Sequence, residues 1–222
     1  MLEASCSHWG KNMVIRILVL ILCLAYSSFL AWDGNRQGFL LGFGLGPALE
    51  LVETKTAFEG ENASTGHTRS NFALLTDARI GYGINSKSLL FISDFANWKK
   101  PGETIITLNS LLLEFNYFIR NTAPSFYISI TGGYSWWLYP FDSYFNQHYS
   151  GNGFSASIGE GYEFSKHYSV KIDLCESNPR YESNIVMSEI DVTGSIANTN
   201  TVKFSEQYMV TSLRLTFCYL WY

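Results

Sequence analysis

The sequence predicts an all-β protein: a helical signal peptide followed by a closed, eight-stranded, antiparallel transmembrane β-barrel of the up-and-down type. Charged residues make up 15% of the 222 residues and aromatic residues 16%, whereas soluble domains carry about 25% charged residues. The mean hydropathy of +0.03 is too low for a bundle of membrane helices. From Gly38 onward, apolar residues recur with a period of two and show no sustained helical period.

Residues 1–31 are expected to be a signal peptide that directs export, with the barrel domain at 32–222. Ile17–Ala31 is an uninterrupted apolar stretch that follows basic residues and ends in small ones. This stretch is shorter than the ~20 residues that span a bilayer as a helix, although an uncleaved anchor remains an alternative. Cleavage after Ser27 and cleavage after Ala31 both stay open, and Met13 is an alternative start.

Eight segments of the remaining chain alternate in the way that membrane strands do. In the last one, Leu213, Leu215 and Phe217 fall on one face and Arg214 on the other. In order, the eight predicted strands are Phe39–Gly46, Phe72–Gly83, Leu89–Ala96, Thr104–Phe118, Phe126–Trp137, Phe154–Phe164, Tyr168–Cys175 and Ser212–Trp221.

The connections between these strands are alternately short and long. The short ones are Ile84–Ser88, Ile119–Ser125 and Ser165–His167, and the long ones are about Pro47–Asn71, Asn97–Glu103, Leu138–Gly153 and Glu176–Lys203. Outer-membrane barrels have short periplasmic turns and longer extracellular loops. The last long connection either continues its flanking strands above the membrane or is mobile.

Charged residues inside the predicted strands lie opposite the apolar face. Because a charge facing lipid at mid-depth costs roughly 2–4 kcal/mol, these residues are expected to form an ion-pair network in the barrel interior. They are Asp77, Arg79, Glu114, Lys171, Asp173 and Arg214.

A few positions fit the alternation poorly. In the third strand both faces are apolar, and the favoured orientation places Leu89, Phe91 and Phe95 outward with Asp94 inward. Elsewhere Glu160 falls on the lipid-facing side, while Ile106 and Leu108 fall on the interior side. A β-bulge or a position above the bilayer would explain these exceptions.

Aromatic residues gather at the strand ends on the outward face, as they do at both interfaces of a membrane. The belt beside the short turns is expected to contain Tyr82, Tyr117, Tyr162, Phe164, Tyr219 and Trp221, with Phe126. Near the long loops, Tyr134, Trp136 and Phe154 form the second belt.

Gly38–Pro47, Ile80–Gly83, Gly161–Phe164 and the terminal Tyr222 resemble the corresponding parts of small OmpA/OmpX-type barrels, and more closely a set of uncharacterised bacterial outer-membrane β-barrel domain proteins. This resemblance implies export through the periplasm of a Gram-negative bacterium, insertion by the barrel-assembly machinery, and a lipid-embedded barrel at the cell surface. Assembly signals of such barrels end on a lipid-facing aromatic residue, whereas the outward run here ends at Trp221.

The sequence offers little for chemistry. A net charge of −4 provides no basic surface for nucleic acid, and the glycines at 42, 44 and 46 lie within a strand, which excludes a phosphate loop. His148 and Asp142 are a weak metal set, so no metal and no cofactor are expected. Cys175 and Cys218 either pair across neighbouring strands or fill the interior as thiols.

His167-Tyr168-Ser169 resembles the His-x-Ser motif of outer-membrane lipid A deacylases, in which His activates Ser. Val170 departs from the Asn that follows in that motif, and the short turn places His167 on the periplasmic side. We therefore expect a non-enzymatic, monomeric barrel with a filled interior, and a structural role or a role in binding an unidentified surface ligand. A lipid-modifying enzyme and a narrow, porin-like pore are the alternatives.

Overall fold

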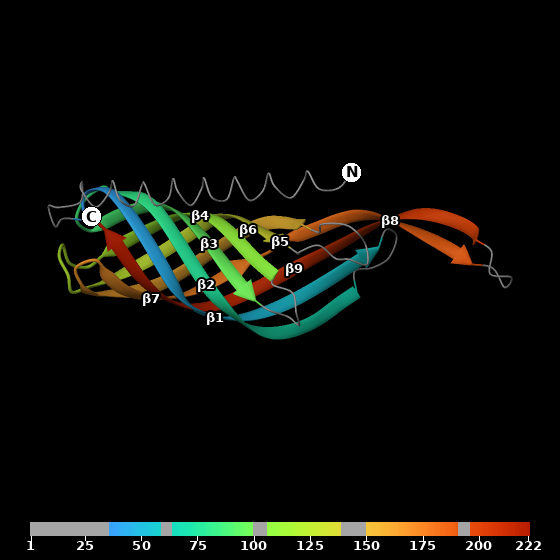
Figure 1. Ribbon diagram of the computed structural model, residues 1–222, viewed down its shortest axis with the longest axis horizontal. Helices are drawn as coiled ribbons and strands as arrows, with labels where there is room; N and C mark the ends of the chain where they lie inside the picture. Colours follow the sequence, from blue (N-terminus) through green and yellow to red (C-terminus); the bar gives the residue numbers. More distant parts are fainter. Residues whose placement is uncertain (1–35, 59–63, 100–105, 139–149, 191–195) are drawn as a thin grey trace, which may run out of the picture.

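The computed structural model describes residues 36–58, 64–99, 106–138, 150–190 and 196–222; the predicted signal peptide lies outside these ranges. Within them the chain forms strands and no helix that is long and apolar enough to cross a membrane. The strands are β1 (Gly38–Phe58), β2 (Ser64–Gly83), β3 (Ser88–Lys99), β4 (Ile106–Phe118), β5 (Ser125–Leu138), β6 (Ser150–Ser165), β7 (Tyr168–Ser177), β8 (Arg180–Ile190) and β9 (Ile196–Trp221) (Figure 1).

The nine strands form a closed barrel whose wall is eight strands around. Neighbouring strands pair antiparallel from β1 to β7, β9 pairs with β7, and β1 pairs with β9 to complete the ring. Strand β8 follows β7 after a break at Asn178 and Pro179 and pairs with the outer part of β9. The predicted eight-stranded, closed antiparallel barrel is thus confirmed.

The strand register fixes how the barrel is staggered. Following paired residues around the ring from Phe39 on β1 leads back to β1 at Leu49, a stagger of 49 − 39 = 10 residues. The path runs through Phe39, Tyr82, Leu90, Phe115, Ile130, Ile158, Leu174, Leu213 and Leu49. Every residue on this spiral is exposed. Eight strands with such a stagger tilt by about 35–45° and enclose a lumen that side chains fill.

The barrel has an apolar exterior and a polar interior. Of the described residues, 31 large apolar side chains are exposed, while 23 polar or charged residues are buried. An exposed apolar surface of this extent is not compatible with water, and a closed barrel leaves no backbone group unpaired inside a bilayer. The barrel wall therefore faces lipid.

The predicted orientation of β3 is wrong. Leu89, Phe91 and Phe95 point into the lumen and Asp94 points outward. Both faces of β3 are rich in apolar residues, so alternation alone did not distinguish them. Pairing did: Phe91 lies opposite Glu114, which is buried, and its ring occupies the space that the missing side chain of Gly81 leaves.

The prediction for the first long connection was wrong. β1 continues to Phe58 and β2 begins at Ser64, so most of Pro47–Asn71 is a paired hairpin. For Glu176–Lys203, the predicted alternative of strands that continue above the membrane is confirmed, because β8 pairs with the first part of β9. Above the bilayer the outward face has no lipid to meet, and the apolar alternation fades while backbone pairing persists.

The other exceptions to the alternation need no bulge. Leu108 is buried and Glu160 is exposed, each in an uninterrupted register with the neighbouring strands. Leu108 packs in an apolar layer near the extracellular mouth.

Candidate functional site

The centre of the lumen contains a buried ion-pair network built around Glu114 of β4. Its carboxylate accepts hydrogen bonds from Arg79 Nη1 at 3.2 Å and from Lys171 Nζ at 3.2 Å. Ser93, Asn116 and Ser129 also donate to it, at 2.7, 3.0 and 3.2 Å. Strand alternation brings these groups from five strands to one level of the lumen.

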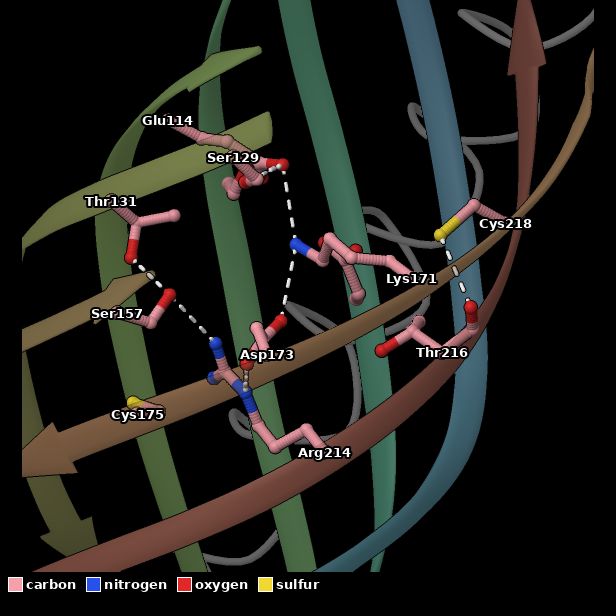
Figure 2. Close-up of polar contacts among 12 residues, drawn as sticks. Glu114, Ser129, Thr131, Ser157, Lys171, Asp173, Cys175, Arg214, Thr216 and Cys218 are labelled. Carbon is pink, nitrogen blue, oxygen red and sulfur yellow. Dashed lines mark hydrogen bonds and ion pairs between the residues drawn. The ribbon is translucent and has the colours of Figure 1, made fainter. Parts of the chain in front are cut away.

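The network continues to Asp173 of β7, which lies directly opposite Arg214 of β9. Arg214 Nε donates to Asp173 Oδ1 at 2.5 Å, and Lys171 Nζ lies 3.4 Å from Asp173 Oδ2. Figure 2 shows Lys171 between Glu114 and Asp173, and Arg214 reaching on to Ser157. Arg79 also pairs with Asp77. The structure thus brings all six predicted interior charges together.

Phe95 of β3 contributes to the same layer. Lys171 Nζ lies 4.9 Å from the centre of its ring and the Arg214 guanidinium carbon 4.5 Å from it. A cation over an aromatic face is attracted to the ring's negative quadrupole. Phe95 therefore stabilises the two cations as well as filling space, a role that its predicted outward orientation would not allow.

A second charged layer lies toward the extracellular mouth. Lys99 Nζ donates to Glu50 at 2.5 Å, Asn97 donates to the same carboxylate at 2.7 Å, and Lys99 lies 4.1 Å from the Trp137 ring centre. An apolar layer, Val52, Leu108, Trp137 and Val210, covers it. Glu50 and Lys99 were not predicted as lumen charges, because both lie in segments that were expected to be loops.

A third charged layer closes the periplasmic end. Arg36 pairs with Glu163 of β6 and donates to the backbone carbonyls of Ser86 at 3.0 Å and Arg120 at 2.7 Å. The hydroxyl of Tyr222 donates to Glu163 at 2.9 Å. Glu163 and Gly161 lie on the inward-facing side of β6, and this pattern could have indicated a charge at this end of the lumen. Nothing in the sequence placed Arg36 beneath the barrel.

Acids and bases balance in the described lumen. Five buried acids face five buried bases: Glu50, Asp77, Glu114, Glu163 and Asp173 against Arg36, Arg79, Lys99, Lys171 and Arg214. Buried charges persist only when they are paired and hydrogen-bonded. A cavity beside Arg79 and Tyr127 measures about 20 Å³, enough for about one water molecule. Among the residues that the structure describes, paired charges thus occupy three levels of the lumen.

The predicted belt residues lie on the outer face, at the strand ends next to the short turns. The rings of Phe126 and Tyr162 are 4.6 Å apart, and those of Tyr219 and Trp221 are 4.3 Å apart. Tyr82, Tyr117 and Phe164 are exposed there too. At the opposite ends, Tyr134 and Phe154 are exposed.

The residues considered for catalysis do not form a catalytic pair in the described chain. His167 Nδ1 lies 2.8 Å from the Leu220 carbonyl oxygen, and its ring stacks on Tyr219 and packs at a tilt against Tyr222. Ser169 Oγ instead lies 3.5 Å from the Tyr127 hydroxyl. The motif is at the periplasmic end, as its position in a short turn predicted.

Cys175 and Cys218 are buried, free thiols in the lumen, so the disulfide alternative is wrong. His148 and Asp142 lie outside the described residues. Within the described ranges, no group of three or more His, Cys, Asp or Glu residues is arranged to hold a metal ion.

No protein-family model and no curated protein matches this chain. Among solved structures, the outer membrane protein OprG from Pseudomonas aeruginosa is similar at 13% identity with a TM-score of 0.53, over 84% of this chain and 97% of OprG. AlkL, solved in lipid bilayers, has 13% identity and a TM-score of 0.46, over 85% of this chain and 92% of AlkL. Neisserial surface protein A has 12% identity and a TM-score of 0.41, over 80% of this chain and 97% of its own.

The likeness to OprG establishes the fold as that of a small outer-membrane β-barrel. The apolar exterior, the short turns at one end and the extended strands at the other agree with it. The chain is an integral membrane barrel with the fold of small outer-membrane proteins.

Proposed function

We propose that this chain is a non-enzymatic, monomeric surface protein whose filled barrel anchors an extracellular β-sheet for interaction. One observation carries the proposal: four strands run far past the bilayer above a lumen that is closed at three charged layers. A solute pore needs an open lumen. A binding protein needs a rigid base and an exposed platform.

The extracellular sheet has the strand order β2-β1-β9-β8. Strand β9 starts at Ile196 and reaches the apolar spiral at Leu213, so at about 3.3 Å per residue its outer part is on the order of 50 Å long. Figure 1 shows this arm of β8 and β9 projecting well beyond the other strands. Such a length provides a platform that reaches beyond the lipid surface.

The described side chains on this sheet carry both signs of charge. Glu182 lies 3.0 Å from both Arg180 and Lys203, and Glu53 lies 3.5 Å from Lys55. A mixed surface does not attract polyanions or polycations over long distances. Recognition here is therefore expected to depend on shape and on backbone pairing.

The sheet ends in edge strands that are open in the described chain. Beyond its contact with β6 at Asn152 and Arg180, β8 pairs on one side, with β9. An edge strand presents unpaired N–H and C=O groups, to which an extended segment of a partner can add. The surface ligand proposed here is an extended protein segment that pairs with an edge of this platform.

The arm of this platform that β8 and the outer part of β9 form can be removed without touching the barrel. Arg180 and Gln207 are paired across β8 and β9, so replacing residues 181–206 by Asn-Gly joins them through a two-residue hairpin turn. Cells that produce the full-length protein are expected to adhere to immobilised collagen or fibronectin, and the shortened variant is expected to lose that adhesion. Failure of the full-length protein to bind, or binding retained by the shortened variant, would contradict the proposal.

Two further measurements separate the alternatives. The purified protein is expected to give silent planar-bilayer recordings, and a steady conductance would favour the pore. Overproduction is expected to leave the lipid A acylation pattern unchanged, and loss of an acyl chain would favour a deacylase.

A further inference from the structure

A groove on the lipid-facing wall of the barrel stands out from the rest of the exterior. It crosses β5, β6, β7 and β9 and has a volume of about 400 Å³. Its apolar side chains are Ile128, Ile158, Ile172, Leu174 and Leu213, and one carboxylate, that of Glu160, lies among them. This surface belongs neither to the lumen nor to the extracellular sheet.

The floor of the groove is backbone. Gly159 has no side chain, and Asp173 turns its carboxylate inward to Arg214. A Cβ added to Gly159 would meet Asp173 within the sheet, so glycine allows β6 and β7 to approach closely. The walls are outward-facing aliphatic side chains on both sides of Glu160, which gives the groove the shape and polarity of a site for an amphiphile.

The depth of Glu160 indicates which leaflet it faces. Tyr162, in the periplasmic aromatic belt, is the next outward residue along β6. With a rise of about 3.3 Å per residue and a tilt of about 40°, Glu160 lies on the order of 5 Å farther into the bilayer. The apolar band is about 25 Å tall, so the carboxylate lies in the periplasmic half, within reach of the headgroup region.

Glu160 differs from the acids of the lumen. Each of those pairs with a base, whereas no described residue forms a hydrogen bond or an ion pair with the Glu160 carboxylate. A carboxylate surrounded by Ile128 and Ile172 is stabilised if a donor comes from the lipid side. A primary ammonium group has three N–H donors and forms a charge-assisted hydrogen bond with a carboxylate.

We propose that this groove binds a glycerophospholipid with a primary amine in its headgroup, taken from the periplasmic leaflet. One acyl chain lies on the aliphatic walls, and the ammonium donates to Glu160. A phospholipid fits better than a protein because the groove is continuous with the wall that faces hydrocarbon, and because one charge of one sign matches one headgroup amine.

The chain contains a matched control. Asp94 of β3 also faces lipid, between Ala78 and Leu111, but it does not line the groove. Substituting Asp94→Asn therefore removes a lipid-facing acid outside the groove. Glu160→Gln removes the lipid-facing acid inside the groove.

The test is native mass spectrometry of the full-length protein released from micelles that contain phosphatidylethanolamine, phosphatidylcholine and phosphatidylglycerol with identical acyl chains. The quaternary ammonium of phosphatidylcholine has no N–H to donate, so the wild-type protein is expected to retain phosphatidylethanolamine preferentially. Glu160→Gln is expected to lower that preference by about tenfold, the equivalent of one charge-assisted hydrogen bond. Asp94→Asn is expected to leave it unchanged, and Glu160→Lys to shift it toward phosphatidylglycerol.

Three results would overturn the proposal: no preference in the wild type, a preference that survives Glu160→Gln, or equal losses in Glu160→Gln and Asp94→Asn. A dimer that Glu160→Gln dissociates would show that the groove binds another copy of the chain instead. Heat-modifiable gel migration checks that every variant is folded. The variant that lacks residues 181–206 retains the groove, so it is expected to bind phosphatidylethanolamine normally whether or not the extracellular sheet has the function proposed above.

Discussion

Arg36 forms a buried ion pair with Glu163, although the two residues are 127 positions apart. Arg36 precedes β1, and Glu163 lies near the periplasmic end of β6. The same guanidinium binds the Ser86 and Arg120 carbonyls of two short turns. One side chain before the first strand therefore fastens three separate parts of the periplasmic rim.

Arg36→Ala is expected to destabilise the folded barrel by about 3–5 kcal/mol, because Glu163 is left as an unpaired buried acid. Urea unfolding in lipid vesicles, followed by tryptophan fluorescence, measures the change. Arg120→Ala is the control: Arg120 is exposed and offers Arg36 its backbone carbonyl, which the substitution keeps. Equal stability of Arg36→Ala and Arg120→Ala would show that the ion pair between Arg36 and Glu163 contributes nothing to stability.

Tyr222 makes the same rim sensitive to alkaline pH. Burial and the neighbouring Glu163 carboxylate raise the pKa of Tyr222 to about 12, from about 10 in an unfolded chain. Between these values the folded protein binds more protons than the unfolded one, so stability falls as the pH rises from about 10 to 12. Unfolding midpoints across this range are expected to fall more steeply for the wild type than for Tyr222→Phe. Parallel curves would contradict the role given to this hydroxyl.

Glu114 is expected to be the least replaceable residue of the lumen. Glu114→Ala leaves Arg79 and Lys171 without a shared acid, and a broken buried pair costs about 3–5 kcal/mol. Folding yield into vesicles and the unfolding midpoint report the loss. The comparison is Glu182→Ala, which breaks two ion pairs on the extracellular sheet, with Arg180 and Lys203, where all three side chains are exposed. These pairs are solvated, so little change is expected.

Much of the fold followed from the sequence because lipid favours apolar side chains on the outer face of a strand, with Asp94 and Glu160 as exceptions. The six lumen charges were placed correctly, since a charge that faces hydrocarbon is costly. The orientation of β3 could not be predicted in this way, because both of its faces are apolar from Leu89 to Ile92. The orientation of Phe91 depends on its pairing with Gly81 of β2, which the sequence of β3 alone does not reveal. The ion pair between Arg36 and Glu163 could not be predicted either, because it joins segments that are distant in the sequence and meet only when the barrel closes.

The two lumen thiols provide a test of how tightly the interior is packed. Cys175 and Cys218 are buried, and the cavity that Cys218 lines is too small for a labelling reagent. With residues 1–31 removed, the folded protein in detergent is expected to resist maleimide, and both thiols are expected to react after boiling. Asn85→Cys, in an exposed turn, is the positive control. Rapid labelling of the folded wild type would mean that the lumen is open.

The orientation of β3 can be decided at two adjacent positions. Ile92 is 53% exposed and faces lipid, whereas Ser93 is buried and donates to Glu114. The spin relaxation of a nitroxide attached to Ile92→Cys in vesicles is therefore expected to be accelerated by oxygen, which concentrates in hydrocarbon. A water-soluble nickel complex is expected to leave that relaxation unchanged. A label at Ser93→Cys is expected to be shielded from both, or to prevent folding by disturbing the network. Oxygen access at position 93 with shielding at 92 would mean that β3 has the opposite orientation. Asp94 would then lie in the lumen, and Phe95 would no longer contact the cations of Lys171 and Arg214. The lumen would contain one more acid than base, which contradicts the balance of buried charges described above.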